Sequence, residues 1–283
     1  MMATVPKCMV LDFDGTFTDV EVEGAPFVRV YRDALSDLIG RDIGADWERA
    51  TQVIAAAPGR YGWVHGGKIV APGNADPYVR CTAVAQLICD AENRLRDPEV
   101  RTAVVQAFYQ LAYRHTVTAF RPDARDTLSR LTASGLPVYV VTNSSTQVVT
   151  QKLRELAPAG LEQLQVIGDA QKFVVAEAND EDTRFDSVPV ERQLDGLERP
   201  IYPRRGRYFD ALARIWRETG TSPAETLVCG DIFELDLSLP IELGLQVHLV
   251  TGPATTGYER AAVARLGERG STGDRVSDVL ARV

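Results

Sequence analysis

The chain has 283 residues, of which 45% are hydrophobic and 25% charged, a composition typical of a globular protein with a sizeable core and room for one large domain or a core plus a smaller one. The formal net charge is −8 and no long basic run occurs, which argues against nucleic acid as a partner. No apolar run reaches the roughly 18 residues of a membrane-spanning helix, so we expect no membrane association.

The first predicted element is a strand. Residues 8–13, CMVLDF, form a short apolar run that stops at Asp-Gly, as a buried strand does before a turn. Helical spacing of apolar residues follows in three stretches: 25–57, about 78–95 and about 98–118. The Gly- and Pro-rich residues 58–78 predict a loop or hairpin. Because no clear apolar strand occurs between 20 and 120, we expect residues 20–120 to form a helical cap domain inserted after the first strand.

Strands and helices alternate from residue 121 onward. Amphipathic or helix-like stretches occupy 121–135, 145–156 and 207–220, and apolar strand-like runs occupy 136–143, 164–168, 226–231 and 245–252. Such alternation predicts an α/β fold with a parallel sheet covered on both faces, built from residues 1–19 and 121–283. Residues 173–203 are acidic, contain prolines and lack periodicity, which suggests a small insertion in this core.

The cysteines and the N-terminus bear on location. Four cysteines are present without CxxC spacing, and Cys8 and Cys229 lie in strand-like runs. Free buried thiols in a cytoplasmic protein fit this pattern better than a disulfide framework. The start, MMATVPK, lacks the apolar segment of a signal peptide. We therefore expect a cytoplasmic protein.

Polar side chains follow three of the predicted strands. They are Asp12 and Asp14 after the first strand, Thr142 and Asn143 after the strand at 136–143, and Asp231, with Asp236 just beyond, after the strand at 226–231. In open parallel sheets, ligands bind outside the carboxyl ends of the strands. Residues far apart in the sequence are thus expected to converge on one crevice.

This set of residues would allow phosphate transfer. The carboxylates of Asp12, Asp14 and Asp231 would make a hard oxygen site suited to Mg²⁺, with Gly15 allowing the sharp turn between the first two. Asp12 could then attack phosphorus and form an aspartyl-phosphate. Asp14 could protonate the leaving alkoxide and later deprotonate the attacking water.

The Thr142 hydroxyl and the Asn143 backbone N–H, at the opening of a helix, could hold phosphate oxygens. Each piece alone is common, since D-x-D-G is often only a turn and T-N after a strand is often only an N-cap. The specificity lies in the order of the pieces and in their shared position at strand ends.

These motifs resemble those of the haloacid dehalogenase superfamily, in its phosphatase branch. The matching segments are DFDGTFTD at 12–19, VYVVTN at 138–143 and CGDIFELD at 229–236. The resemblance covers residues 5–20 and 121–252. It implies a Rossmann-like core, Mg²⁺ as cofactor, a helical cap between the first and second motifs, and a supporting place for Asp236 behind the metal ligands.

The third motif departs from the pattern. The family usually places a Lys, sometimes an Arg, at the start of the helix before the last motif, where it holds the nucleophile and the phosphate together. The segment PRRGR offers Arg204, Arg205 and Arg207, and Arg205 lies closest to the family's usual distance before the last motif. Lys172 lies at about the usual distance after the second motif. Both distances hold only if residues 173–203 are an insertion. We predict Arg205, with Lys172 and the other two arginines as alternatives.

Other polar residues have less distinctive settings. We expect Lys152 on a solvated helix face and His248 as a structural residue of its strand. The cap loop at 59–80 carries a ring, an imidazole and an ammonium group that could close over a substrate, or be only a solvated hairpin.

The sequence thus predicts a Mg²⁺-dependent phosphatase acting on a small phosphorylated metabolite. A phosphotransferase or phosphomutase with the same intermediate, or a non-catalytic binding protein with the same fold, are the alternatives. A carbon–halogen hydrolase is disfavoured because that branch of the family lacks the second acidic residue, here Asp14. The absence of G-x-S-x-G argues against a serine hydrolase. The sequence decides neither the substrate nor the oligomeric state.

Overall fold

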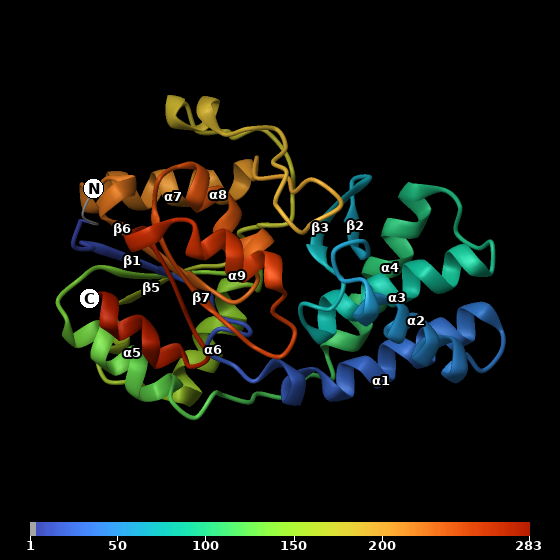
Figure 1. The fold of residues 1–283 in the computed structure, drawn as a ribbon. Helices are drawn as coiled ribbons and strands as arrows, with labels where there is room; N and C mark the ends of the chain where they lie inside the picture. Colours follow the sequence, from blue (N-terminus) through green and yellow to red (C-terminus); the bar gives the residue numbers. More distant parts are fainter. Residues whose placement is uncertain (1–3) are drawn as a thin grey trace. The chain divides into compact units, whose positions relative to one another are not determined.

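The computed structural model describes residues 4–283, and the chain divides into two compact units. The core unit comprises the residues up to 19, 120–196 and 200–283. The second unit comprises 20–119 with 197–199 (Figure 1). A capping role for the second unit stays a prediction.

The core unit is built on a six-stranded parallel sheet, in the order β5-β4-β1-β6-β7-β8. Its strands are β1 (Cys8–Leu11), β4 (Val138–Val141), β5 (Leu164–Ile167), β6 (Thr226–Gly230), β7 (Gln246–Val250) and β8 (Gly270–Gly273). The predicted α/β fold with a Rossmann-like parallel sheet is confirmed. Strand β1 lies between β4 and β6, so the carboxyl ends of the three strands that precede the predicted site residues are adjacent.

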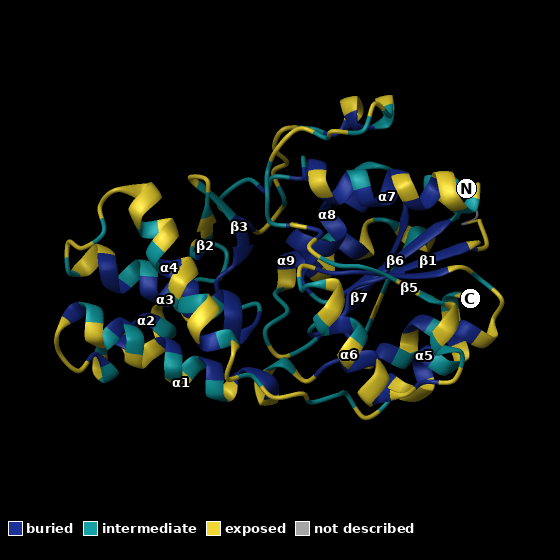
Figure 2. Cartoon of the chain, turned by 180° about the vertical axis from the view of Figure 1, so that it is seen from behind, coloured by how far each residue is buried: buried dark blue, intermediate teal, exposed yellow. Residues whose placement is uncertain are grey.

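Helices cover both faces of this sheet, with α5 and α6 on one side and α7 and α8 on the other (Figure 1). The core helices are α5 (Ala124–Ala133), α6 (Thr146–Leu156), α7 (Gly206–Thr219), α8 (Ser238–Glu242) and α9 (Gly257–Ala264). All residues of β1, β4, β6 and β7 are buried, as Figure 2 shows by its dark strands. That burial explains why these strands are almost wholly apolar.

Apolar packing on one face of the sheet holds α5 and α6 in place. Met9 and Leu11 of β1 belong to one buried cluster with Leu128 of α5 and with Val149 and Leu153 of α6. Burial of side chains of this size contributes about 1.5–3 kcal/mol each. Because successive side chains of β1 point to opposite faces of the sheet, one set packs on the face covered by α5 and α6 and the other on the face covered by α7 and α8.

Helix α7 shows the clearest amphipathic pattern. Its buried residues recur at helical spacing, from Tyr208 and Phe209 to Ile215 and Trp216. The helix ends at Thr219. The next residue, Gly220, has φ 67°, a conformation that glycine adopts readily, and donates its N–H to the Trp216 carbonyl. The indole N–H of Trp216 donates to the Thr226 hydroxyl over 3.0 Å, which ties the helix to the start of β6.

The last strand and the helix before it were not predicted. Strand β8 has the sequence GSTG, which carries no apolar residue. It pairs with β7 through backbone hydrogen bonds, and an edge strand of this kind leaves no hydrophobic pattern in the sequence. Helix α9 begins with a capping box made by Thr256 and Glu259.

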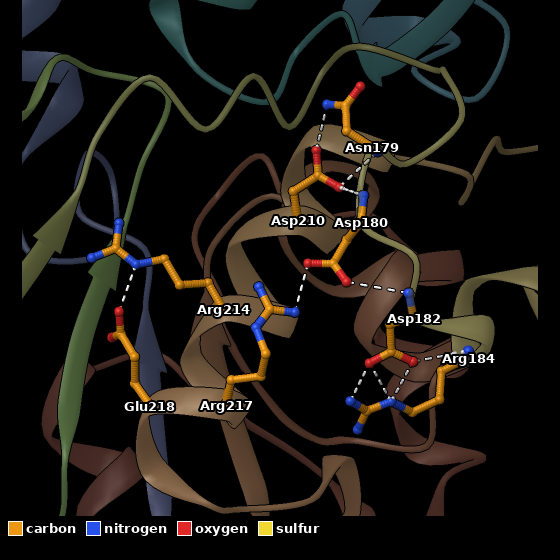
Figure 3. Close-up of polar contacts among 8 residues, drawn as sticks. All are labelled: Asn179, Asp180, Asp182, Arg184, Asp210, Arg214, Arg217 and Glu218. Carbon is orange, nitrogen blue, oxygen red and sulfur yellow. Dashed lines mark hydrogen bonds and ion pairs between the residues drawn. The ribbon is translucent and has the colours of Figure 1, made fainter.

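Residues 173–203 are mostly irregular and are fastened to α7 by polar contacts (Figure 3). The Asp210 carboxylate accepts the backbone N–H groups of Asn179 and Asp180, each over 2.9 Å. The guanidinium of Arg217 donates to Asp180 over 2.6 Å. The segment is thereby held along α7.

The second unit is mostly helical, with one hairpin. It contains α1 (Val20–Ile39), α2 (Gly44–Ala56), α3 (Pro77–Ala91) and α4 (Pro98–Tyr113), with β2 (Gly62–His65) and β3 (Lys68–Pro72). The single helical stretch expected at 25–57 is thus two helices, separated after Gly40 (φ 85°). Aromatic rings fill the unit's core, with the Phe27 ring 4.9 Å from Tyr78 and 5.5 Å from Tyr31.

Two further findings bear on the expected setting of the chain. All four cysteines are free and buried. Over residues 4–283, none of the helices has the length and apolar character that crossing a membrane requires. The cytoplasmic location stays a prediction.

Candidate active site

Asp12 is held at the edge of the sheet by its own backbone. Its N–H donates to the Cys229 carbonyl over 2.8 Å, so the pairing of β1 with β6 continues one residue past the strand. The chain then turns at Gly15, whose φ is 91°, a conformation that side chains disfavour. A Cβ there would lie 2.2 Å from Asp231 Oδ2. Glycine therefore permits both the turn and the approach of Asp231.

The turn is fixed from outside by an arginine. The Nε and one terminal nitrogen of Arg121 donate to the Gly15 carbonyl over 2.9 and 2.8 Å. The Gly15 N–H donates to the Thr18 hydroxyl over 3.0 Å. The loop that carries Asp12 and Asp14 is thus restrained before any ligand binds.

A buried lysine lies against Asp12. Lys172 Nζ is 2.7 Å from Asp12 Oδ1 and 2.9 Å from Asp236 Oδ1, and all three side chains are buried. The Thr16 hydroxyl is 3.2 Å from Asp12 Oδ2 and 3.1 Å from Asp231 Oδ1. Asp12 is thereby held on one oxygen by an ammonium group and on the other by a hydroxyl that also reaches Asp231.

The electrostatics of this pair follow from burial and charge. Burial raises the pKa of the Asp12 carboxyl, opposed by the charge of Lys172 and reinforced by that of Asp236. Burial lowers the pKa of the Lys172 ammonium, but the charges of Asp12 and Asp236 outweigh burial and leave that pKa above its ordinary value. Lys172 is therefore a permanent cation beside Asp12.

Three carboxylates are placed closely enough to hold a metal ion. Oxygens of Asp12, Asp231 and Asp236 lie within 4.8 Å of one another. Hard carboxylate oxygens on adjacent strand ends suit Mg²⁺, so the donor set fits that ion. Asp236 also accepts from Lys172 and, over 2.9 Å, from the Ile232 N–H. These contacts support the expectation that Asp236 stands behind the ligands, and the ligand set itself stays a prediction.

Asp14 faces a different part of the core. Its Oδ2 accepts from the Ser144 hydroxyl over 2.6 Å and from the Thr142 hydroxyl over 3.4 Å. Its Oδ1 accepts from Lys152 Nζ over 2.8 Å. The side chain is 21% exposed. The Asp14 carboxylate is thus directed toward the loop after β4 and toward α6, and its predicted metal role is not tested by these contacts.

The expectation for Lys152 is wrong. Its side chain is 9% exposed and pairs with Asp14, so it does not lie on a solvated face. The helical spacing was ambiguous because Lys152 precedes Leu153, which is buried against the sheet. The contact of Ser144 with Asp14 was also not predicted, although the position of Ser144 two residues after Thr142 in the same loop could have indicated it.

The loop after β4 reaches both lysine-bearing segments. The Asn143 side-chain oxygen accepts the backbone N–H of Lys172 over 2.7 Å. Helix α6 begins at Thr146, with Ser145 as its N-cap. Asn143 therefore lies in the loop before the helix and not at its opening, and its role as a phosphate donor stays a prediction.

The three arginines of PRRGR do not supply the contact to Asp12. Arg205 is buried and donates to the Phe173 carbonyl over 2.9 Å. Arg204 pairs with Glu177, and Arg207 is exposed. The contact that the sequence led us to expect from Arg205 is made by Lys172, the alternative that the sequence left open.

The backbone explains why the two candidates were hard to separate. Ala176 bridges to Arg205, and the Gly206 N–H donates to the Ala176 carbonyl over 3.0 Å. The segment between Lys172 and Arg205 therefore leaves and returns at nearly the same place. Either residue could be near the site by spacing alone, and only the side-chain contacts distinguish them.

Comparison with known families bears on the whole of this core. A family model of haloacid dehalogenase-like hydrolases matches residues 6–239. The chain belongs to the haloacid dehalogenase-like hydrolase family. The match includes every strand-end carboxylate described above, from Asp12 to Asp236. The resemblance drawn from the motifs is therefore confirmed at the level of the family.

Solved structures support the fold of this hydrolase. A predicted phosphoglycolate phosphatase from Haemophilus somnus 129pt is 15% identical, with a TM-score of 0.56 and 98% of each chain covered. A Bacteroides fragilis protein assigned as a haloacid dehalogenase-like hydrolase is 15% identical, with a TM-score of 0.55, 97% of this chain covered and 99% of that one. A Thermotoga maritima protein assigned as a β-phosphoglucomutase is 13% identical, with a TM-score of 0.51, 98% of this chain covered and 99% of that one.

These identities establish the fold alone. Curated proteins gave no match.

Proposed function

We propose that this hydrolase is a Mg²⁺-dependent phosphatase that acts on a small phosphorylated metabolite through an aspartyl-phosphate on Asp12. One observation carries the proposal: the Asp12 carboxylate lies at a strand end, 2.7 Å from a buried ammonium group. A carboxylate so placed can meet a phosphate dianion, because the permanent positive charge offsets the repulsion between the two.

The metal role falls to the carboxylate cluster. Asp12 and Asp231 would hold Mg²⁺, with Asp236 supporting them from behind. When bound, Mg²⁺ supplies positive charge to the phosphate oxygens. Gly15 admits Asp231 to this position, since any side chain there would collide with its carboxylate.

The first half of the reaction forms a bond from Asp12. An Asp12 carboxylate oxygen attacks phosphorus, the bond from phosphorus to the ester oxygen breaks, and the departing alkoxide takes a proton from Asp14. Lys172 offsets the charge that gathers between Asp12 and the phosphoryl oxygens. The loop restrained by Arg121 keeps Asp12 and Asp14 in a fixed relation throughout.

The second half restores the enzyme. A water molecule attacks phosphorus, the bond to Asp12 breaks, and Asp14 accepts the proton that the water loses. Phosphate then leaves. The Thr142 hydroxyl and the Asn143 N–H, in the loop after β4, are the groups that we expect to hold phosphate oxygens during both steps.

Three further points follow from the proposal. The net charge of −8 and the phosphate chemistry point to a small-molecule substrate and not to nucleic acid. The free, buried thiols support a cytoplasmic location. Asp14 supports phosphate transfer over carbon–halogen cleavage, following the family pattern.

The test is phosphate release from a panel of phosphorylated metabolites and p-nitrophenyl phosphate, with and without Mg²⁺. We expect release that needs Mg²⁺, stops with a chelator, and leaves a phosphoryl group detectable on Asp12 by mass spectrometry. Transfer of phosphate to a second hydroxyl without release would indicate a phosphotransferase or phosphomutase instead. Tight binding of a panel member without turnover would indicate a binding protein.

A further inference from the structure

Lys152 belongs neither to the family motifs nor to the groups used in the proposed reaction. Lys152 lies in α6, and its side chain is only 9% exposed. Nζ is 2.8 Å from Asp14 Oδ1 and 6.0 Å from the centre of the Phe13 ring. A lysine could extend from this helix to water, but this one is directed to the strand end that carries Asp14.

Burying an ammonium group is unfavourable unless a partner compensates the lost hydration. The partner here is a carboxylate that also receives two hydroxyl donors, from Ser144 and Thr142. These two hydroxyls share Oδ2, and Lys152 takes Oδ1. Both oxygens of Asp14 are therefore held by hydrogen bonds, and among residues 4–283 Lys152 alone holds the second one.

The two buried lysines divide the two carboxylates between them. Lys172 contacts Asp12 and Asp236, and Lys152 contacts Asp14. Lys7 differs from both: it is 64% exposed and pairs with Glu225 at the opposite end of β1. Each residue of the D-x-D pair thus has an ammonium group of its own.

We propose that Lys152 is a positioning residue that holds the Asp14 carboxylate oriented to take the proton of the attacking water. The inference rests on the proposed phosphatase function. In that step water oxygen bonds to phosphorus, the bond between phosphorus and Asp12 breaks, and the water proton passes to Asp14. Without Lys152, Asp14 keeps only the hydroxyl donors on one oxygen and can rotate away from the water.

The experiment separates the two steps of turnover. Wild type, Lys152→Met, Lys152→Gln and Lys152→Arg are mixed with p-nitrophenyl phosphate and Mg²⁺, and p-nitrophenolate release is followed from the first milliseconds. p-Nitrophenolate leaves without a proton, so the first step should stay near the wild-type rate. Hydrolysis of the aspartyl-phosphate should slow by about tenfold to a hundredfold in Lys152→Met, the range for a misplaced proton acceptor.

The expected signature is a burst. Lys152→Met should release about one p-nitrophenolate per enzyme quickly and then turn over slowly, with phosphorylated protein accumulating in quenched samples. Lys152→Arg, which keeps a cation, should recover most of the hydrolysis rate. Lys7→Met is the matched control: it also removes a paired lysine, and both steps should match wild type.

Other outcomes would overturn the inference. Equal slowing of both steps in Lys152→Met and Lys152→Gln, without a burst, would show a merely structural role. Hydrolysis at the wild-type rate in folded Lys152→Met would show that the lysine is dispensable. If Lys152→Met does not fold, Lys152→Gln gives the same decision. Absence of any phosphorylated protein in wild type would count against the proposed function itself, whereas its presence without accumulation in the variants counts against this inference alone.

Discussion

Asp12 and Asp14 are two residues apart, and their surroundings differ. Asp12 continues the sheet, is buried, and contacts Lys172, which also holds Asp236. Asp14 follows on the same loop, is partly exposed, and contacts Ser144, Thr142 and Lys152. Two identical side chains on one loop are thus placed in two separate networks.

The difference shows how one loop can serve two chemical roles. A nucleophile has to be held in place against a like-charged phosphate, which a buried, permanent cation achieves. A proton carrier has to exchange protons with the substrate and with water, which requires partial exposure. The loop supplies both because β1 ends at Leu11, so that Asp12 stays against β6 and Asp14 falls toward β4.

The largest expected effect comes from removing the nucleophile. Asp12→Asn keeps the shape of the side chain but cannot form the aspartyl-phosphate, so kcat should fall on the order of a thousandfold or more. The measurement is Mg²⁺-dependent phosphate release, with circular dichroism to show that the variant folds. Activity above about a tenth of wild type would contradict the covalent role, given the losses seen for essential nucleophiles.

The next effect tests which cation serves Asp12. Lys172→Met should lower kcat/KM, with a loss of about 2–4 kcal/mol of transition-state stabilisation, the range for one preorganised electrostatic group. Arg205→Met should lower thermal stability, because Arg205 is buried and donates to Phe173, while kcat/KM of the folded protein stays near wild type. Arg207→Ala is a matched exposed control. The reverse result, with Arg205→Met inactive and Lys172→Met active, would restore Arg205.

A smaller and selective effect is expected at Asp14. Asp14→Asn should slow the first step about a hundredfold for an alkyl phosphate, whose alkoxide needs a proton, and much less for p-nitrophenyl phosphate. Single-turnover rates of the two substrates give the comparison. Equal slowing of alcohol and p-nitrophenolate release would show that Asp14 does not act as the acid. The difference in surroundings between Asp12 and Asp14 would then not reflect different chemical roles.

The smallest effect uses a buried titratable group away from both networks. His248 lies in β7, where Nδ1 is 2.9 Å from the Ser271 hydroxyl, and burial lowers its pKa to about 4. Between pH 6.5 and 4 the unfolded chain binds a proton that the folded chain excludes, so stability rises with pH across that window and is lost as pH falls. At pH 5 the loss amounts to about 2 kcal/mol.

His248→Gln should therefore reduce the difference between unfolding free energies measured in urea at pH 7 and at pH 5. An unchanged difference would show that other groups carry the acid sensitivity. This effect on stability is separate from the strand-end carboxylates, because His248 lies inside the sheet and has no part in the proposed reaction.

Several features of the site could not be predicted from the local sequence, because they depend on how the sheet and its helices pack. Nothing in the local sequence of GSTG marks β8 as a strand, because its pairing with β7 uses backbone groups that every residue has. Lys152 read as a surface residue because a lysine in an amphipathic helix is usually exposed, and only the placement of α6 against β1 and β4 directs it to Asp14. Spacing alone allowed either Arg205 or Lys172 near the site, and only the contact between Lys172 and Asp12 decided between them.

The sequence alone determined the α/β class, the family and the strand-end carboxylates. These depend on local patterns: apolar runs that stop at Asp-Gly, Thr-Asn and Gly-Asp, repeated in a fixed order along the chain. The tertiary structure alone decided which cation contacts Asp12 and what holds Asp14. Those choices depend on side chains 160 residues apart for Lys172 and Asp12 and 138 apart for Lys152 and Asp14, and such contacts exist only once the sheet and its helices have packed.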